Sequence, residues 1–202
     1  MKKNQALAAT LLGATLALAG CAGGTDPGAG SGMDHGSMSA SAESSPDDAA
    51  EHGPADTMFA QMMIPHHEQA VEMSEIMLAK DGLDPRILDL ANKIKAAQAP
   101  EIATMTEWLG AWGEPVEAES MGHSMEGMMT DEDLDALDSA KGDAAAELFL
   151  TRMIEHHEGA VEMAENQVAE GSNPEAVALA EQVVEDQQAE IKAMQEMLPD
   201  FR

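Results

Sequence analysis

Histidine and methionine occur together at two places in this sequence, with a spacing that could hold a soft metal ion. The first stretch reads Met-Ile-Pro-His-His-Glu-Gln-Ala-Val-Glu-Met over residues 63–73, and the second reads Met-Ile-Glu-His-His-Glu-Gly-Ala-Val-Glu-Met over residues 153–163. The two copies are 90 positions apart, which indicates an internal repeat. Because imidazole suits copper, zinc and iron while thioether sulfur selects Cu(I), the combination favours copper.

The repeated stretches must be helical for these side chains to act together. Apolar residues recur three and four positions apart around each copy, as in an amphipathic helix. At about 100° per residue, His66 and His156 lie near the centre of the apolar face, so we expect both in the core. The candidate ligands on these faces are Met62, Met63, His66 and Met73 in the first copy and Met153, His156 and Met163 in the second. Arg152 replaces Met62 in the second copy.

The second histidine of each copy, His67 or His157, lies about 100° from the first, at the edge of the apolar face. We expect these two side chains either to face solvent or to support the ligands from behind. A Gln-x-x-Glu pair follows each copy on an inward stripe, so Glu101 and Glu190 are possible further ligands. The accompanying amides are Gln98 and Gln187.

The remaining patterns predict an all-α protein. We expect one helix over 56–80, a second from Asp84-Pro85 to about 112, a short one within 130–141, a fourth over 143–170 and a fifth from Asn173-Pro174 to about 198. Pro65 and Pro100 should each remove a backbone hydrogen bond and bend a helix. Repeat one (56–112), a Met-rich linker (113–142) and repeat two (143–198) then form an antiparallel, ferritin-like four-helix bundle over 56–202.

The first 20 residues have the pattern of an export signal. Lys2 and Lys3 precede an apolar run that ends in Leu-Ala-Gly-Cys21, which resembles a bacterial lipobox. The prediction is cleavage before Cys21, diacylation of its thiol, and anchoring to the outer face of the cell membrane or to a periplasmic membrane face. The alternative is a plain signal peptide with an incidental cysteine. Residues 21–55, rich in Gly, Ser and Ala, should form a flexible tether.

Methionine and histidine also gather in two segments that have no apolar core to fill. One lies in the tether and contains Met33, His35 and Met38. The other lies between the repeats and contains Met121, His123, Met125, Met128 and Met129. Their composition fits additional capture of soft metal ions, or low complexity without a role.

Charge and ligand type narrow the partners. With 38 acidic and 10 basic residues, a net charge of −28 disfavours nucleic acid and favours cations. Structural zinc normally uses cysteine, and the only cysteine is the predicted lipid anchor. Di-iron bundles use more inward carboxylates than this sequence offers, and no Cys-x-x-Cys-His haem attachment is present. Copper, as Cu(I) through thioethers or Cu(II) through imidazoles, is the expected ligand.

The patterns Phe-x-x-x-Met-Ile-x-His-His-x-x-Ala-Val-x-Met and Gln-x-x-Glu-Ile-x-x-Met resemble the ferritin-like domain of the CopM-type copper-binding proteins, a family catalogued as a domain of unknown function. The resemblance covers about residues 56–198. It implies a helical bundle, export, and a role in copper or silver binding and resistance. The residues that match the family motif are Met63, His66, His67, Met153, His156 and His157.

Three functions follow from these patterns. The leading hypothesis is a non-enzymatic lipoprotein that sequesters copper or passes it on, with a copper-handling protein or a second copy as a further partner. Its Cu(II) affinity should fall as pH drops through about 6.5, where imidazole ordinarily gains a proton. The second hypothesis is a ferritin-like oxidase that uses Glu101 and Glu190. The third is a metal-free scaffold in which the histidines hydrogen-bond to Gln98 and Gln187.

Overall fold

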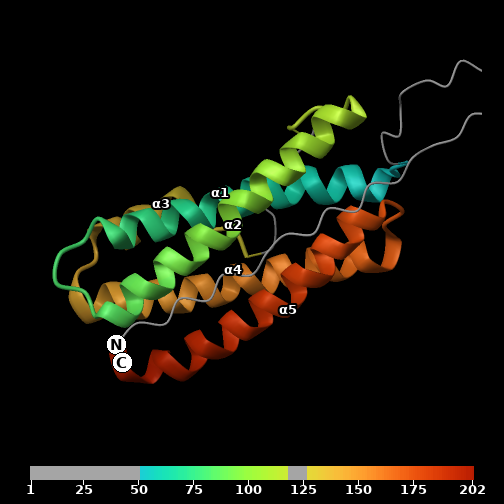
Figure 1. The fold of residues 1–202 in the computed structure, drawn as a ribbon. Helices are drawn as coiled ribbons and strands as arrows, with labels where there is room; N and C mark the ends of the chain where they lie inside the picture. Colours follow the sequence, from blue (N-terminus) through green and yellow to red (C-terminus); the bar gives the residue numbers. More distant parts are fainter. Residues whose placement is uncertain (1–50, 118–126) are drawn as a thin grey trace, which may run out of the picture. The chain divides into compact units, whose positions relative to one another are not determined.

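A computed structural model describes residues 51–117 and 127–202. The predicted signal peptide, Cys21, the cluster from Met33 to Met38 and the linker residues Met121, His123 and Met125 lie outside these ranges. The described residues form five α-helices and a terminal 3-10 turn (Figure 1). They are α1 (Pro54–Leu78), α2 (Pro85–Trp112), α3 (Asp131–Ser139), α4 (Gly142–Glu170), α5 (Pro174–Met197) and η1 (Leu198–Phe201).

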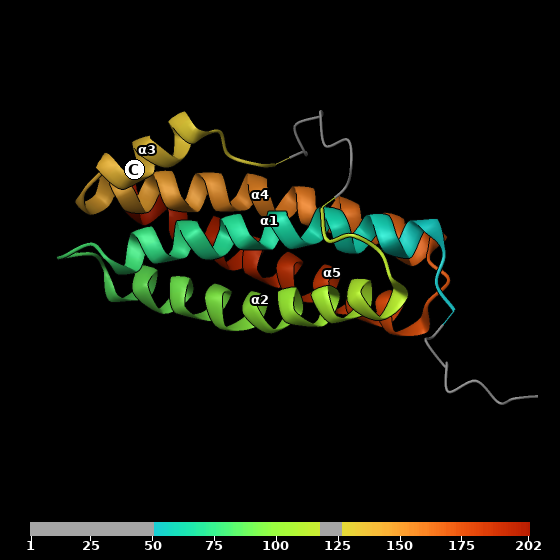
Figure 2. The same ribbon diagram turned by 90° about the horizontal axis from the view of Figure 1, so that it is seen from above.

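Each repeat forms a helical hairpin, and the two hairpins meet through their first helices. Helix α1 packs along α2, α4 packs along α5, and α1 and α4 lie side by side (Figure 2). The short α3 rests on both α1 and α4. This arrangement confirms the predicted all-α four-helix bundle. Helices α1 and α2 continue through Pro65 and Pro100.

Local signals in the sequence set the helix boundaries. The Asp84 side chain accepts a hydrogen bond from Arg86 N at the start of α2, and the Asn173 side chain accepts from Glu175 N and Ala176 N at the start of α5. Helix α2 ends at Trp112, and the following Gly113 caps it with a φ of 75°, in the left-handed region that glycine tolerates. No helix in the described ranges is both long and apolar enough to cross a membrane.

The start of α1 is fixed to the turn between α4 and α5 by one buried carboxylate. Asp56 accepts hydrogen bonds from Gly53 N, Ser172 N and Asn173 N, and from Gln167 Nε2 at 2.6 Å. Burial alone would raise the pKa of Asp56, but these four donors outweigh it and lower the pKa below its ordinary value. The carboxylate therefore holds together the two helices that carry the repeated histidines.

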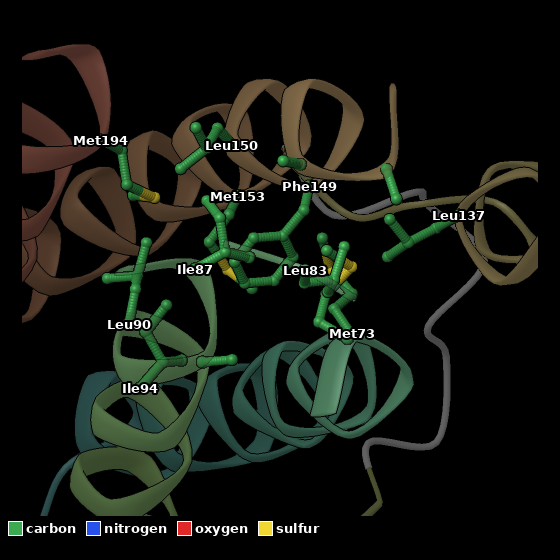
Figure 3. Packing of buried hydrophobic residues seen from close by; sticks show 14 of the residues in the cluster. Met73, Leu83, Ile87, Leu90, Ile94, Leu137, Phe149, Leu150, Met153 and Met194 are labelled. Carbon is green, nitrogen blue, oxygen red and sulfur yellow. The ribbon is translucent and has the colours of Figure 1, made fainter. Parts of the chain in front are cut away.

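The apolar core is divided into two clusters. One contains Met73, Ile87, Phe149 and Met153 (Figure 3), and the other contains Phe59, Met63, Met105 and Ala160. Each of the four long helices contributes residues to both clusters, and one or two buried polar residues separate its two contributions. These residues are His66 and His67 in α1, Gln98 in α2, His156 and His157 in α4, and Gln187 in α5. We call this set the polar layer. It crosses the middle of the bundle.

Candidate metal centre

The centre of the polar layer is a pair of closely packed histidines with tilted rings, one from each repeat. The rings of His66 and His156 lie 3.7 Å apart between centroids, at an interplanar angle of 39°, and both side chains are fully buried. Helices α1 and α4 place them there because each histidine lies on the apolar stripe of its helix. The predicted burial of His66 and His156 is confirmed, and the two residues face each other directly.

His67 and His157 are also fully buried, so neither faces solvent. His67 Nε2 lies 2.7 Å from Glu101 Oε2, and His157 Nε2 lies 2.8 Å from Glu190 Oε2. Because an ionised carboxylate only accepts, we assign the ring proton to Nε2 and a lone pair to Nδ1 in the neutral ring. Metal-binding histidines commonly have this arrangement, with a carboxylate on the other nitrogen.

Several atoms of the polar layer make no hydrogen bond of ordinary geometry within the described residues. They are Nδ1 and Nε2 of His156, Nδ1 of His67 and His157, and Oε1 of Gln98 and Gln187. Leaving a buried polar atom unmatched typically costs about 1–3 kcal/mol, so a group of six in one layer indicates a ligand that the protein chain itself does not supply. Oε1 of Gln98 and Oε1 of Gln187 accept no hydrogen bond from the histidines.

The electrostatic environment keeps His156 neutral. Burial lowers its pKa well below 6.5, and the nearby rings of His66, His157 and His67 lower it further. Neutral imidazole is the form that binds metal. The lowered pKa moves the expected acid loss of Cu(II) affinity at His156 to a pH below the 6.5 expected from the sequence.

The structure does not bring all predicted methionines to the histidine pair. Met63 and Met153 are fully buried but belong to different core clusters, so they lie on opposite sides of the polar layer. Helices α1 and α4 run antiparallel. Met63 and Met153, each three positions before its histidine, therefore lie toward opposite ends of the bundle. Met73 packs with Phe149 and Met153 in one apolar cluster (Figure 3).

Met62 and Met163 come together about one to two helical turns from the histidine pair. They line one pocket between α1 and α4, together with Met58. Sequence reasoning missed Met58, although its position four residues before Met62 places the two side chains on the same helical face.

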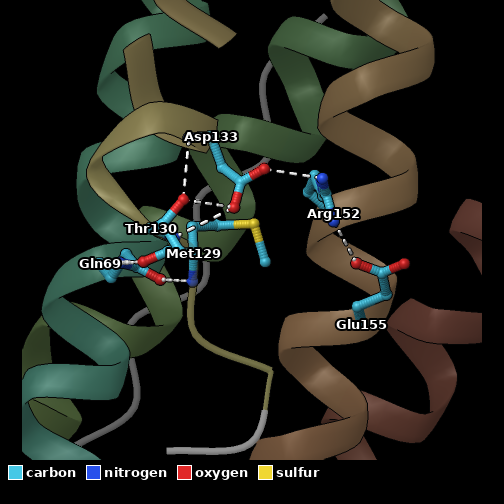
Figure 4. Close-up of polar contacts among 6 residues, drawn as sticks. All are labelled: Gln69, Met129, Thr130, Asp133, Arg152 and Glu155. Atoms are coloured by element: carbon cyan, nitrogen blue, oxygen red, sulfur yellow. Dashed lines mark hydrogen bonds and ion pairs between the residues drawn. The ribbon is translucent and has the colours of Figure 1, made fainter. Parts of the chain in front are cut away.

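The end of the linker is held across α1 and α4 by Gln69, which sequence reasoning also missed. Gln69 Nε2 donates to Met129 O, and Met129 N donates to Gln69 Oε1, at 2.9 and 2.7 Å (Figure 4). Met129 is buried, and Met128 lines a pocket beside Asp133, Arg152 and Glu155. We call residues 127–130 the strap. A Cβ on Gly127, where φ is 83°, would lie 2.6 Å from Glu155 O, so the strap approaches α4 very closely.

The chemistry of the donor set tests which metal the layer fits. In the described parts of the chain, no group of three or more His, Cys, Asp or Glu side chains converges in a way that could hold a metal ion. Di-iron bundles build their centre from such groups, whereas the polar layer offers a pair of imidazoles. Imidazole nitrogens flanked by thioether sulfurs suit copper or silver, which accept few ligands and bind sulfur well.

Comparison with known proteins places the chain in a family. The family model described as "Domain of unknown function (DUF305)" matches residues 56–198. A DUF305 protein of Streptomyces coelicolor, designated as secreted, has 36% identity over 73% of this chain and 93% of its own, with a TM-score of 0.69. A DUF305 fragment of Deinococcus radiodurans has 32% identity over 74% of this chain and 98% of its own, with a TM-score of 0.68.

CopM, solved in a Cu(I)-bound form, has 35% identity over 72% of this chain and 96% of its own, with a TM-score of 0.61. CopM has also been solved in Cu(II)-bound and Ag-bound forms. No curated protein matches the chain. Because the family match contains both hairpins, the histidine pair and the whole polar layer, this protein belongs to the DUF305 family.

Proposed function

We propose that this protein binds copper outside the cytoplasm, without catalysing a reaction, and so sequesters the ion or passes it on. The observation that supports the proposal most strongly is the polar layer, which gathers unmatched imidazole and amide atoms from both repeats. Buried polar atoms in native proteins are nearly always matched, so six unmatched atoms in one layer call for a partner. CopM, similar over the same helices, has been solved with Cu(I), Cu(II) and Ag bound.

The residues that would hold the ion are His66 and His156, whose rings lie 3.7 Å apart between centroids. His67 and His157 would support them from the same layer. Glu101 and Glu190 would act on the metal indirectly, by fixing the orientation of those two rings. Met63 and Met153 would contribute thioethers from the two sides of the layer. This assignment replaces direct ligation by Glu101 and Glu190 with a supporting role, because each carboxylate already accepts from an imidazole.

The test is equilibrium competition against a chromophoric chelator, with Cu(I) under anaerobic reductant and with Cu(II) in air. Replacing His66 and His156 together by Ala should abolish tight Cu(II) binding and weaken Cu(I) binding at least tenfold. A second pair, His66→Gln with His156→Gln, keeps polar side chains in the layer and should lose binding to the same extent. The control is His52→Ala, which removes a half-buried histidine that stacks on Trp112 outside the layer.

If both double variants fold, as judged by helical circular dichroism, and bind Cu(II) as tightly as the parent, the repeated histidines are structural. Elemental analysis of protein from copper-supplemented and iron-supplemented cells checks the metal itself, since iron in place of copper would favour the oxidase hypothesis.

The proposed location is the outer face of the cell membrane, with Cys21 as the lipidated N-terminus. The support is the apolar run that ends in Leu-Ala-Gly-Cys and the secreted designation of the Streptomyces relative. Cys21→Ser should release the protein from the membrane fraction, because two acyl chains supply stable anchoring. Unchanged membrane association, together with a mass that shows no lipid on the parent, would contradict the anchor.

A further inference from the structure

Three thioethers line one pocket at the seam between α1 and α4. Met58 and Met62 come from α1 and Met163 comes from α4, and the pocket has a volume of about 340 Å³. Met58 is 58% exposed, whereas Met62 and Met163 are half-buried. Met62 also lies one helical turn before His66. The methionines therefore extend from the solvent toward the buried histidine pair.

The rest of the pocket offers no group that repels a cation. Its other lining residues are Pro54, Ala55, Phe59, Asn166, Gln167 and Glu170. Glu170 is the acidic residue of the lining and is exposed, and the net charge of −28 over the whole chain attracts cations. Thioethers are neutral, soft ligands and select Cu(I) or Ag(I) over harder ions.

The internal repeat supplies a comparison, because the equivalent positions lie at the other end of the same seam. There Leu148 replaces Met58, Arg152 replaces Met62, and Met73 is the equivalent of Met163 but is fully buried. Arg152 donates to Asp133 Oδ1 at 2.7 Å and to Glu155 Oε2 at 3.0 Å (Figure 4). The pocket beside Arg152 also contains Met128 and Met129, but a soft cation would meet a guanidinium there, at the position where the first repeat has the sulfur of Met62.

The same end is covered by the connection between the repeats. Helix α3 packs on α1 and α4, and its Leu137 is buried beside Met73 and Phe149 (Figure 3). The strap crosses the seam at Gln69, which lies two helical turns from Met62 on the same face of α1. The seam is thus covered from its middle to one end, while the end with Met58, Met62 and Met163 has an open pocket.

We propose that Met58, Met62 and Met163 form an outer site that captures Cu(I) or Ag(I) at this end of the seam, before the ion reaches His66 and His156. The transfer to the histidines rests on the proposed copper binding of the polar layer, but the outer site itself does not. Only one of the two pseudo-equivalent ends has the three sulfurs, so the protein takes up soft ions from one end.

The experiment uses Ag(I), which needs no reductant, and the full chain labelled with [methyl-¹³C]methionine. The methyl signals of Met58, Met62 and Met163 should be the first to shift during the titration. The triple variant Met58→Leu, Met62→Leu, Met163→Leu should bind one Ag(I) fewer than the parent in equilibrium competition, since Leu keeps the volume but lacks sulfur. The control triple variant Met77→Leu, Met105→Leu, Met197→Leu should keep the parent stoichiometry.

The outer site and the polar layer can fail separately. If the three methyl signals stay in place while other methionines shift, or if the triple variant binds as many Ag(I) ions as the parent, the outer site is wrong. If the three methyl signals shift in the His66→Gln, His156→Gln variant as they do in the parent, the outer site binds Ag(I) independently of the histidine pair. Absence of any metal at the histidines would then overturn the proposed function and leave the outer site intact.

Discussion

The neutral state of His156 makes the stability of the metal-free protein depend on pH in a direction that can be predicted. The native pKa of His156 lies well below 6.5, whereas the unfolded chain binds this proton with the ordinary pKa of 6.5. Below pH 6.5 the unfolded state therefore holds more protons than the native state. Native stability is fully present above pH 6.5 and declines as the pH falls below it.

The size of the effect follows from the unfolded pKa alone, as long as the native ring stays neutral. One pH unit below 6.5, protonation stabilises the unfolded chain by about 1.4 kcal/mol, whereas one unit above 6.5 the effect is below about 0.1 kcal/mol. The free energy of unfolding should therefore fall by about 1.4 kcal/mol from pH 7.5 to pH 5.5 through His156. Carboxylates contribute little to this change, because most remain ionised in that range.

Urea unfolding of the metal-free protein at pH 7.5, 6.5 and 5.5 measures the effect. In the variant His156→Gln the fall between pH 7.5 and 5.5 should be smaller than in the parent by about 1.4 kcal/mol. Phe149→Leu serves as the control, because it loosens the core without removing a titratable group and should keep the parental pH dependence. If parent and His156→Gln lose the same stability on acidification, His156 is not held neutral and the electrostatic description of the layer is wrong.

Three further predictions concern the groups around the layer. Asp56→Ala should lower the free energy of unfolding, measured in urea, by about 2–4 kcal/mol, since four donors lose their acceptor. Because the native pKa of Asp56 is lowered, the difference in free energy of unfolding between parent and variant should narrow as the pH falls below 3.8. A difference that stays constant with pH would contradict this. Glu101→Ala with Glu190→Ala should weaken copper binding about 10–100-fold in chelator competition, whereas the exposed control Glu107→Ala should not. If the double variant binds copper as tightly as the parent, Glu101 and Glu190 do not orient the imidazoles. Gln69→Leu should speed amide hydrogen exchange at Met129 without loss of helical circular dichroism, and unchanged exchange would mean that the strap is held by other contacts.

The repeated pattern was sufficient to predict the fold. Apolar spacing, the Asp-Pro and Asn-Pro helix starts and the duplicated motif gave helix positions within about two residues of those observed at α1, α2 and α4. The same pattern placed His66 and His156 in the core. These features are local, and local spacing determines which face of a helix is apolar.

The environment of His67 and His157 could not be read from one helical stripe. Helix α1 contacts two neighbours, α4 and α2, and these lie in different directions around its axis. His66 faces α4, whereas His67, about 100° around the helix, faces α2 and reaches Glu101. A residue at the edge of one apolar stripe was in fact at the centre of a second interface. The Gln-x-x-Glu pair on the following helix was the signal that could have revealed this contact.

The positions of the methionines depend on how the two repeats pack, which a single repeat does not contain. A duplicated hairpin packed antiparallel brings equivalent residues together only at the crossing point, so the histidines meet while Met63 and Met153 separate to either side. Equivalent residues farther from the crossing point lie at opposite ends of the seam. They can differ in residue type between the two repeats without affecting the packing of the histidine pair. Met62 and Arg152 are such a pair: one lines the open thioether pocket, and the other binds Asp133 beside the strap. The departure from internal symmetry at this position gives the two ends of one nearly symmetric bundle different chemistry, and this difference supplies a direction for an ion that moves toward the histidines.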